Sequence, residues 1–106
     1  MAKTTIVALL QRFLQRLLKE GTPVERVFLY GSYARGEENE ESDIDVMVIS
    51  EIFNKHDDQI VGKAWRISRS FDVRIEPYTV GKKRFLNDDF SPLLQYVKKE
   101  GIEINI

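Results

Sequence analysis

The sequence predicts a mixed α/β domain, of α+β type, in which helices flank one small mixed β-sheet. Segments with apolar residues at i, i+3 and i+4, typical of amphipathic helices, alternate with short apolar runs typical of buried strands. The chain has 106 residues, close to the commonest domain size, and contains no repeat or linker. We therefore expect one domain over residues 1–106, with the element order α-β-α-β-α-β-α-β.

The first half of the chain contains two predicted helices and two predicted strands. Residues 4–20 have helical apolar spacing, and Gly21 follows where the helix should end. Residues 24–30 finish in a continuous apolar run, as expected for a strand buried on both faces. Residues 33–36 are expected to form a short helix, and residues 44–50 form a second, mostly apolar strand.

The second half continues the same alternation. Residues 56–70 have an apolar stripe at helical spacing, and Trp65 on this stripe is expected in the core. Residues 71–78 alternate as a strand should, and Pro77, which has no N–H, is expected to mark its end. The remaining predicted elements are a short helix over 81–86, a helix between Ser91-Pro92 and Gly101, and a strand over 102–106.

Composition excludes several classes of function. Lys and Arg number 16 and Asp and Glu number 17, so no basic excess exists for general nucleic-acid binding. With no cysteine and one histidine, thiolate chemistry and a His-rich zinc site are excluded. The N-terminal stretch is amphipathic rather than continuously apolar, so we expect no signal peptide, no membrane partner and a cytoplasmic location.

The segment over residues 28–50 concentrates the candidate chemistry. Its first strand stops at Gly31-Ser32, a turn that can present backbone N–H groups to a phosphate. Asp43 and Asp45 begin the next strand and point to the same side, because side chains alternate along a strand. Their Cα atoms should lie about 6.6 Å apart, so both carboxylates can reach one cation or a close pair of cations.

These residues carry a resemblance to a known family. Gly31-Ser32, ten further residues and then Asp43-x-Asp45 resemble the signature of the DNA polymerase beta-like nucleotidyltransferase superfamily. The wider string from Leu29 to Gly36, leading into the acid pair, is similar to its minimal nucleotidyltransferase branch. The resemblance implies a nucleotidyltransferase fold and the transfer of a nucleoside monophosphate from an NTP to a hydroxyl group.

The resemblance also implies a role for each matching residue. Gly31 and Ser32 would hold the triphosphate, and Asp43 and Asp45 would bind Mg²⁺. Arg35 either approaches the triphosphate or pairs with the acidic loop that follows it.

A third carboxylate is expected on the third strand, where it would bind metal and accept the proton of the nucleophile. Asp72, flanked by apolar residues, is the first choice, and Glu76 is the alternative on the same face. A salt bridge to Arg74 is the structural alternative for each.

We expect the enzyme to be an adenylyltransferase that uses ATP. Minimal members of the family often work with a HEPN-type helical partner in a toxin–antitoxin system, so the acceptor could be a tyrosine of such a protein. The rival from another class is a non-catalytic binding module that acts by contact. A small-molecule nucleotidyltransferase is less favoured, because those enzymes add an acceptor domain. Self-association as a homo-oligomer stays open.

Overall fold

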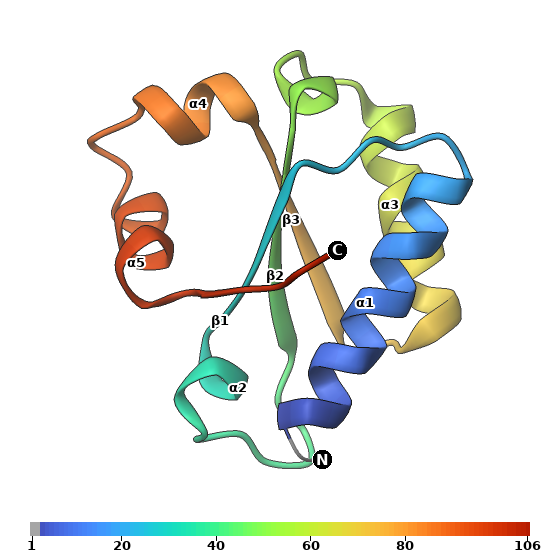
Figure 1. The fold of residues 1–106 in the computed structure, drawn as a ribbon, viewed down its shortest axis with the longest axis vertical. Helices are drawn as coiled ribbons and strands as arrows, with labels where there is room; N and C mark the ends of the chain where they lie inside the picture. Colours follow the sequence, from blue (N-terminus) through green and yellow to red (C-terminus); the bar gives the residue numbers. More distant parts are fainter. Residues whose placement is uncertain (1–2) are drawn as a thin grey trace.

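The computed structural model describes residues 3–106 and places one four-stranded sheet between two layers of helices (Figure 1). The strand order is β3-β2-β1-β4. Strand β1 pairs antiparallel with both β2 and β4, whereas β2 and β3 run parallel. The elements are α1 (Lys3–Lys19), β1 (Arg26–Tyr30), α2 (Ser32–Arg35), β2 (Ile44–Ser50), the 3₁₀ helix η1 (Glu51–Phe53), α3 (Asp58–Phe71), β3 (Ile75–Gly81), α4 (Lys82–Asn87), α5 (Pro92–Glu100) and β4 (Ile102–Glu103).

The two faces of the sheet are covered by different helices. Helices α1 and α3 lie over one face, and α4 and α5 lie over the other, as Figure 1 shows. The core between the sheet and α1 and α3 contains fully buried Phe13 and Leu14 together with Val46 and Val48 of β2. The core on the other face contains Met47 and Ile49 of β2. Strand β2 is therefore apolar on both faces because it lies between two cores.

The predicted fold class is confirmed, and β2 has the bounds that its apolar run predicted. The prediction that the third strand begins at residue 71 is wrong, because α3 continues through Phe71. The ring of Phe71 packs edge-on against Phe13 of α1, with 6.3 Å between ring centroids. This tertiary contact is made by the last turn of the helix, and the strand starts four residues later, at Ile75.

The prediction that Pro77 ends the strand is also wrong, since β3 runs on to Gly81. The carbonyl of Arg74 accepts a hydrogen bond from Ile44 N–H of β2 at 2.8 Å. Even-numbered residues of β3 therefore direct their backbone groups toward β2, and odd-numbered ones direct theirs away. Pro77 lies at an outward position of an edge strand, where a missing N–H removes no bond of the ladder.

One further difference concerns the C-terminal end of the chain. The predicted last strand over 102–106 is shorter, and pairing with β1 is limited to Ile102 and Glu103, extended by a bond from Ile104 N–H to the carbonyl of Val27. No helix within residues 3–106 is long and apolar enough to cross a membrane.

Candidate active site

The glycine turn lies directly over one of the predicted carboxylates. Gly31 joins β1 to α2 with φ 77° and ψ −154°, a conformation that favours glycine. A Cβ atom at this position would collide with Oδ2 of Asp45. Glycine is therefore required for the backbone conformation and for the close approach of the turn to the carboxylate.

Strand pairing brings a third carboxylate to the acid pair. In the parallel register between β2 and β3, Asp45 lies opposite Glu76. Asp43 is exposed and precedes β2, two residues before half-buried Asp45. Asp43, Asp45 and Glu76 line one open cavity of about 380 Å³, together with Tyr30, Trp65, Pro77 and Tyr78.

The electrostatics of this cavity favour a cation. Burial raises the pKa of the Asp45 carboxyl, and the negative charges of Asp43 and Glu76 raise it further, while Arg35 acts in the opposite direction. Burial, with the nearby charge of Asp45, also raises the pKa of the Tyr30 hydroxyl to about 12. A cation that neutralises the carboxylates would relieve this repulsion, and three carboxylates are the oxygen ligands that Mg²⁺ prefers.

The carboxylates are not gathered into a ready-made metal site. Over residues 3–106, no three Asp, Glu or His side chains are close enough together to hold an ion without movement. Glu76 instead forms an ion pair with Arg69 of α3 at 3.7 Å. For Glu76 to bind a cation together with the aspartates, its carboxylate would have to move toward them.

Trp65 and Arg69 are neighbours of the site that the sequence did not predict. Trp65 is half-buried and lines the cavity, so the prediction that it belongs to the core is wrong. The guanidinium of Arg69 lies over its ring, 4.9 Å from the centroid. The apolar stripe of α3 predicts which face of this helix packs inward. It does not predict that Trp65, on this stripe, lines the cavity together with Asp45 and Glu76.

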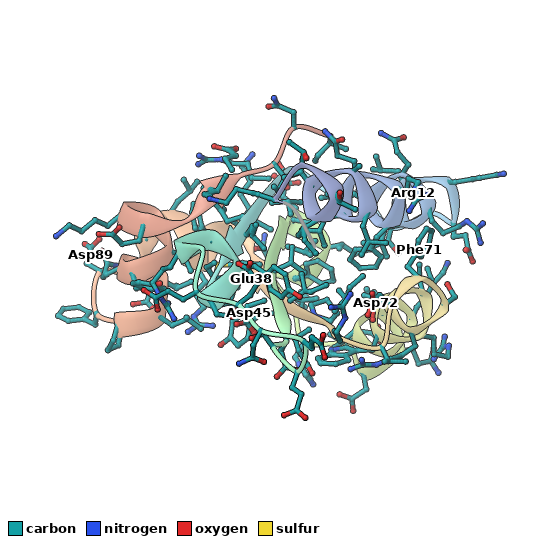
Figure 2. All side chains as sticks on the ribbon, turned by 90° about the horizontal axis from the view of Figure 1, so that it is seen from below. Arg12, Glu38, Asp45, Phe71, Asp72 and Asp89 are labelled. Atoms are coloured by element: carbon teal, nitrogen blue, oxygen red, sulfur yellow. The ribbon has the colours of Figure 1, made fainter. Side chains whose placement is uncertain are left out.

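Asp72, the first choice for the third carboxylate, is not brought to the cavity. It follows the last residue of α3, and Figure 2 shows it beside the end of that helix, apart from Asp45. Arg74 binds its carboxylate with Nε at 3.0 Å and a terminal nitrogen at 2.7 Å, and backbone N–H of Arg74 also donates to it at 2.9 Å. These hydrogen bonds from Arg74 hold the pKa of the Asp72 carboxyl below its usual value. The salt bridge considered as the structural alternative is therefore what Asp72 forms.

Arg35 forms hydrogen bonds both to helix α5 and to the acidic loop that follows α2. It donates to the hydroxyl of Tyr96 at 2.8 Å and to the carboxylate of Glu37, in the acidic loop, at 3.2 Å. It also influences the pKa of Asp45. Arg35 is thus held at the margin of the site between α5 and the loop, close enough to act on charge within the cavity.

The chain is similar to known proteins over most of its length. The sequence pattern of the nucleotidyltransferase domain family matches residues 10–103. A candidate protein adenylyltransferase from Methanocaldococcus jannaschii is 34% identical over 83 residues, which cover 76% of this chain and 79% of the relative.

Solved structures share the fold at low sequence identity. A candidate nucleotidyltransferase from Sulfolobus solfataricus superposes with a TM-score of 0.61 at 15% identity, covering 95% of this chain and 80% of the other. A toxin–antitoxin complex with AMP-PNP contains a chain with a TM-score of 0.61 at 21% identity, covering 89% of this chain and 71% of that one.

Proposed function

This chain belongs to the nucleotidyltransferase family and is a nucleotidyltransferase, and we propose that it transfers AMP from ATP to a hydroxyl group on a protein. The observation that carries the proposal is the cavity in which Asp43, Asp45 and Glu76 lie beside the Gly31 turn. Carboxylates next to a turn of this kind are suited to a nucleotide bound through a divalent cation.

In this proposal Asp43, Asp45 and Glu76 hold Mg²⁺. The bound cation would neutralise the triphosphate and stabilise the charge that develops during displacement. Gly31 allows the backbone to approach the triphosphate, and Ser32 offers its hydroxyl and N–H.

The chemical step is a displacement at the α-phosphorus. The oxygen of the acceptor hydroxyl forms a bond to this phosphorus, and the bond to the bridging oxygen breaks, so that pyrophosphate leaves. Glu76 accepts the proton of the hydroxyl. We assign this role to Glu76 rather than Asp72, because Asp72 is engaged by Arg74 whereas Glu76 lies opposite Asp45.

Two similarities support a protein acceptor. The Methanocaldococcus jannaschii relative is described as a candidate protein adenylyltransferase, and one solved structure of similar fold is a toxin–antitoxin complex with AMP-PNP. Together with the family resemblance, they favour a tyrosine hydroxyl of a HEPN-type helical partner, with this chain as the antitoxin.

The test is AMP transfer by the double variant Asp43→Asn, Asp45→Asn. With labelled ATP, Mg²⁺ and the HEPN-type partner protein, we expect the transfer rate to fall roughly 1,000-fold or more, because the variant loses the charge that holds the cation. The matched control is Asp57→Asn with Asp58→Asn, which makes the same charge change at the exposed start of α3. Unchanged labelling by the first variant, folded by circular dichroism, would refute the catalytic proposal.

A second candidate is a binding module that acts on its partner by contact. It is favoured by the ion pair that Arg69 forms with Glu76, which keeps this carboxylate occupied. Neutralisation of the partner's toxicity by the double variant, at the wild-type level, would support this candidate.

A further inference from the structure

Strand β3 lies at an open edge of the sheet. It ends the strand order β3-β2-β1-β4, and no other strand within residues 3–106 pairs with its outer side. Because odd-numbered residues point away from β2, Thr79 directs both its N–H and its carbonyl outward, and Pro77 directs a carbonyl alone. Such a row of backbone groups is a template for another extended chain.

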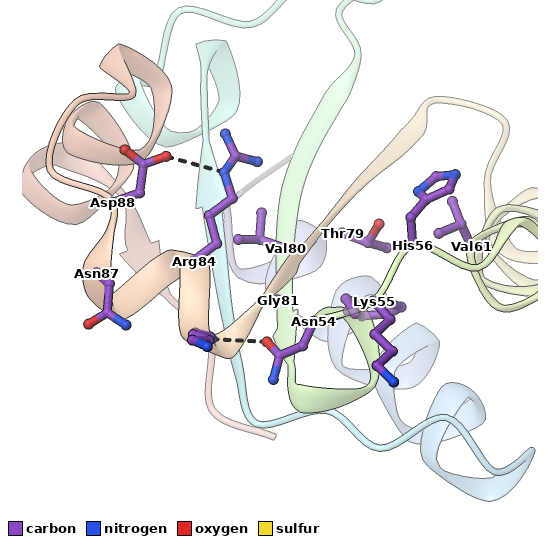
Figure 3. Close-up of a pocket in the computed structure, with 12 residues that line it drawn as sticks. Asn54, Lys55, His56, Val61, Thr79, Val80, Gly81, Arg84, Asn87 and Asp88 are labelled. Carbon is purple, nitrogen blue, oxygen red and sulfur yellow. Dashed lines mark hydrogen bonds and ion pairs between the residues drawn. The ribbon is translucent and has the colours of Figure 1, made fainter.

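A groove runs along this open edge. Thr79, Val80 and Gly81 line a cavity of about 590 Å³. Figure 3 shows this cavity between the connection from η1 to α3, which carries Lys55 and His56, and helix α4. Thr79, whose backbone groups point outward, is therefore one of the residues that line this cleft, and the cleft has side-chain walls on two sides.

The charge of the groove is mainly positive. Lys55, Lys83 and Arg84 line it, and the one carboxylate among the lining residues, Asp88, is paired with Arg84 at 3.3 Å. The two lysines form none of the protein's described salt bridges. The groove is thus suited to acidic side chains.

The groove and the cavity of the proposed active site are lined by adjacent stretches of β3. Three consecutive residues of β3, Glu76, Pro77 and Tyr78, line the carboxylate cavity, and the next three line the groove. From Thr79 to Glu76 an extended strand covers about 10 Å. A peptide held at Thr79 would therefore reach the carboxylates after about three residues.

We propose that an extended, acidic segment of the acceptor protein pairs with β3 at Thr79, lies in this groove and directs its hydroxyl into the carboxylate cavity. The inference rests on the proposed function, because it names how the acceptor of that reaction binds. Strand addition would supply affinity through main-chain hydrogen bonds, and the lysines would select acidic neighbours of the hydroxyl.

The test measures binding of a fluorescent copolymer of glutamate and tyrosine by anisotropy, with Mg²⁺ present. Thr79→Pro removes the outward N–H while leaving the bonds from β3 to β2, as Pro77 already does. We expect this variant to bind roughly tenfold more weakly, because strand pairing loses a hydrogen bond and meets the proline ring. The matched control, Thr79→Val, keeps the N–H and should bind within about twofold of wild type.

A second pair of variants tests the charge of the groove. If Thr79→Pro does not fold, this pair decides whether the acidic copolymer binds in the groove. Lys55→Glu with Lys83→Glu should weaken copolymer binding roughly tenfold or more, and Lys19→Glu with Lys99→Glu, on exposed positions of α1 and α5, should change it little. A copolymer of lysine and tyrosine should bind the wild type more weakly than the acidic one.

Several results would overturn the inference. These are no binding of the acidic copolymer, equal binding by folded Thr79→Pro and wild type, or sedimentation showing a dimer of the wild type that Thr79→Pro abolishes. Failure of the inference is distinguishable from failure of the proposed function. Wild-type AMP transfer without copolymer binding refutes only the docking site, and proline-sensitive binding without any AMP transfer refutes only the reaction.

Discussion

Asp45 is the side chain of the site that is both closely packed and surrounded by like charge. Its carboxylate lies against the backbone of Gly31, its neighbours Asp43 and Glu76 are also acidic, and it is half-buried. Burial and the two neighbouring negative charges each raise the free energy of the ionised form. The folded protein therefore bears an electrostatic cost at the position that the proposed reaction needs charged.

This cost predicts a pH-dependent effect of Asp45→Asn. Because folding raises the pKa of Asp45, the protonated form is favoured in the fold, and stability is lost as pH rises through the folded-state pKa. Without metal, we expect the variant to have the larger free energy of unfolding at pH 7, and the difference to disappear as pH falls toward about 4.

Urea denaturation between pH 4 and pH 8 in the presence of EDTA measures this difference, with Asp89→Asn on the exposed loop before α5 as the control. Addition of Mg²⁺ should stabilise the wild type and narrow the gap. A variant that is less stable than wild type at pH 7 would contradict the assignment of repulsion to this site.

Glu76 and Asp72 should separate catalysis from stability. Glu76→Gln should reduce AMP transfer roughly 100-fold or more with little change in the unfolding midpoint, since the ion pair that Glu76 forms with Arg69 is a long one. Asp72→Asn should lower the free energy of unfolding by about 1–2 kcal/mol, because it weakens charge-assisted hydrogen bonds to Arg74. Its transfer rate should stay within about threefold of wild type. Loss of transfer in a folded Asp72→Asn variant would show that the assignment is reversed.

At the scale of elements, the pattern of apolar residues predicts the ends of a strand correctly where the strand is buried along most of its length. Strand β2 lies between two cores, so its apolar run predicts both of its ends. The turn at Gly31 is similarly predictable, because glycine is the residue that most readily adopts the positive φ that this turn requires.

The start of β3 could not be predicted in the same way. Residues 71–78 alternate in polarity, yet Phe71 is held in the last turn of α3 by its contact with Phe13, far away in the sequence. Val73 is 71% exposed because it lies in the turn before the strand. Because the strand starts later than predicted, Asp72 lies outside it and Glu76 lies on it. The identity of the third carboxylate therefore depends on the contact between Phe13 and Phe71, which no local sequence pattern indicates.

Over the whole molecule, the site depends on strand order. Asp45 lies on a central strand and Glu76 on the edge strand, and they are neighbours only because β2 and β3 pair in parallel. The sequence predicts the strands, but it contains no signal for their order or register. The groove along β3 is a product of the same order, formed by segments from η1 to α4.

This arrangement predicts that the reactants stabilise the edge of the sheet. ATP with Mg²⁺ would bridge β2 and β3 through their carboxylates, so local opening of β3 should become rarer. We expect amide hydrogen exchange at Glu76, Tyr78 and Val80, which face β2, to slow roughly tenfold on addition of ATP and Mg²⁺. The Asp43→Asn, Asp45→Asn variant should show no such slowing. Equal exchange with and without nucleotide in the wild type would contradict the bridging role.

Pro77 has a consequence for how acceptors would be recognised. A chain that pairs with β3 finds an outward N–H at Thr79 but none at Pro77, so it cannot slide along the edge without losing a bond. The proline thereby fixes the alignment of the added strand. The choice of acceptor would then depend on the number of residues between the segment paired with β3 and the reactive hydroxyl. Acceptors with unrelated sequences can have the same number of residues in this interval.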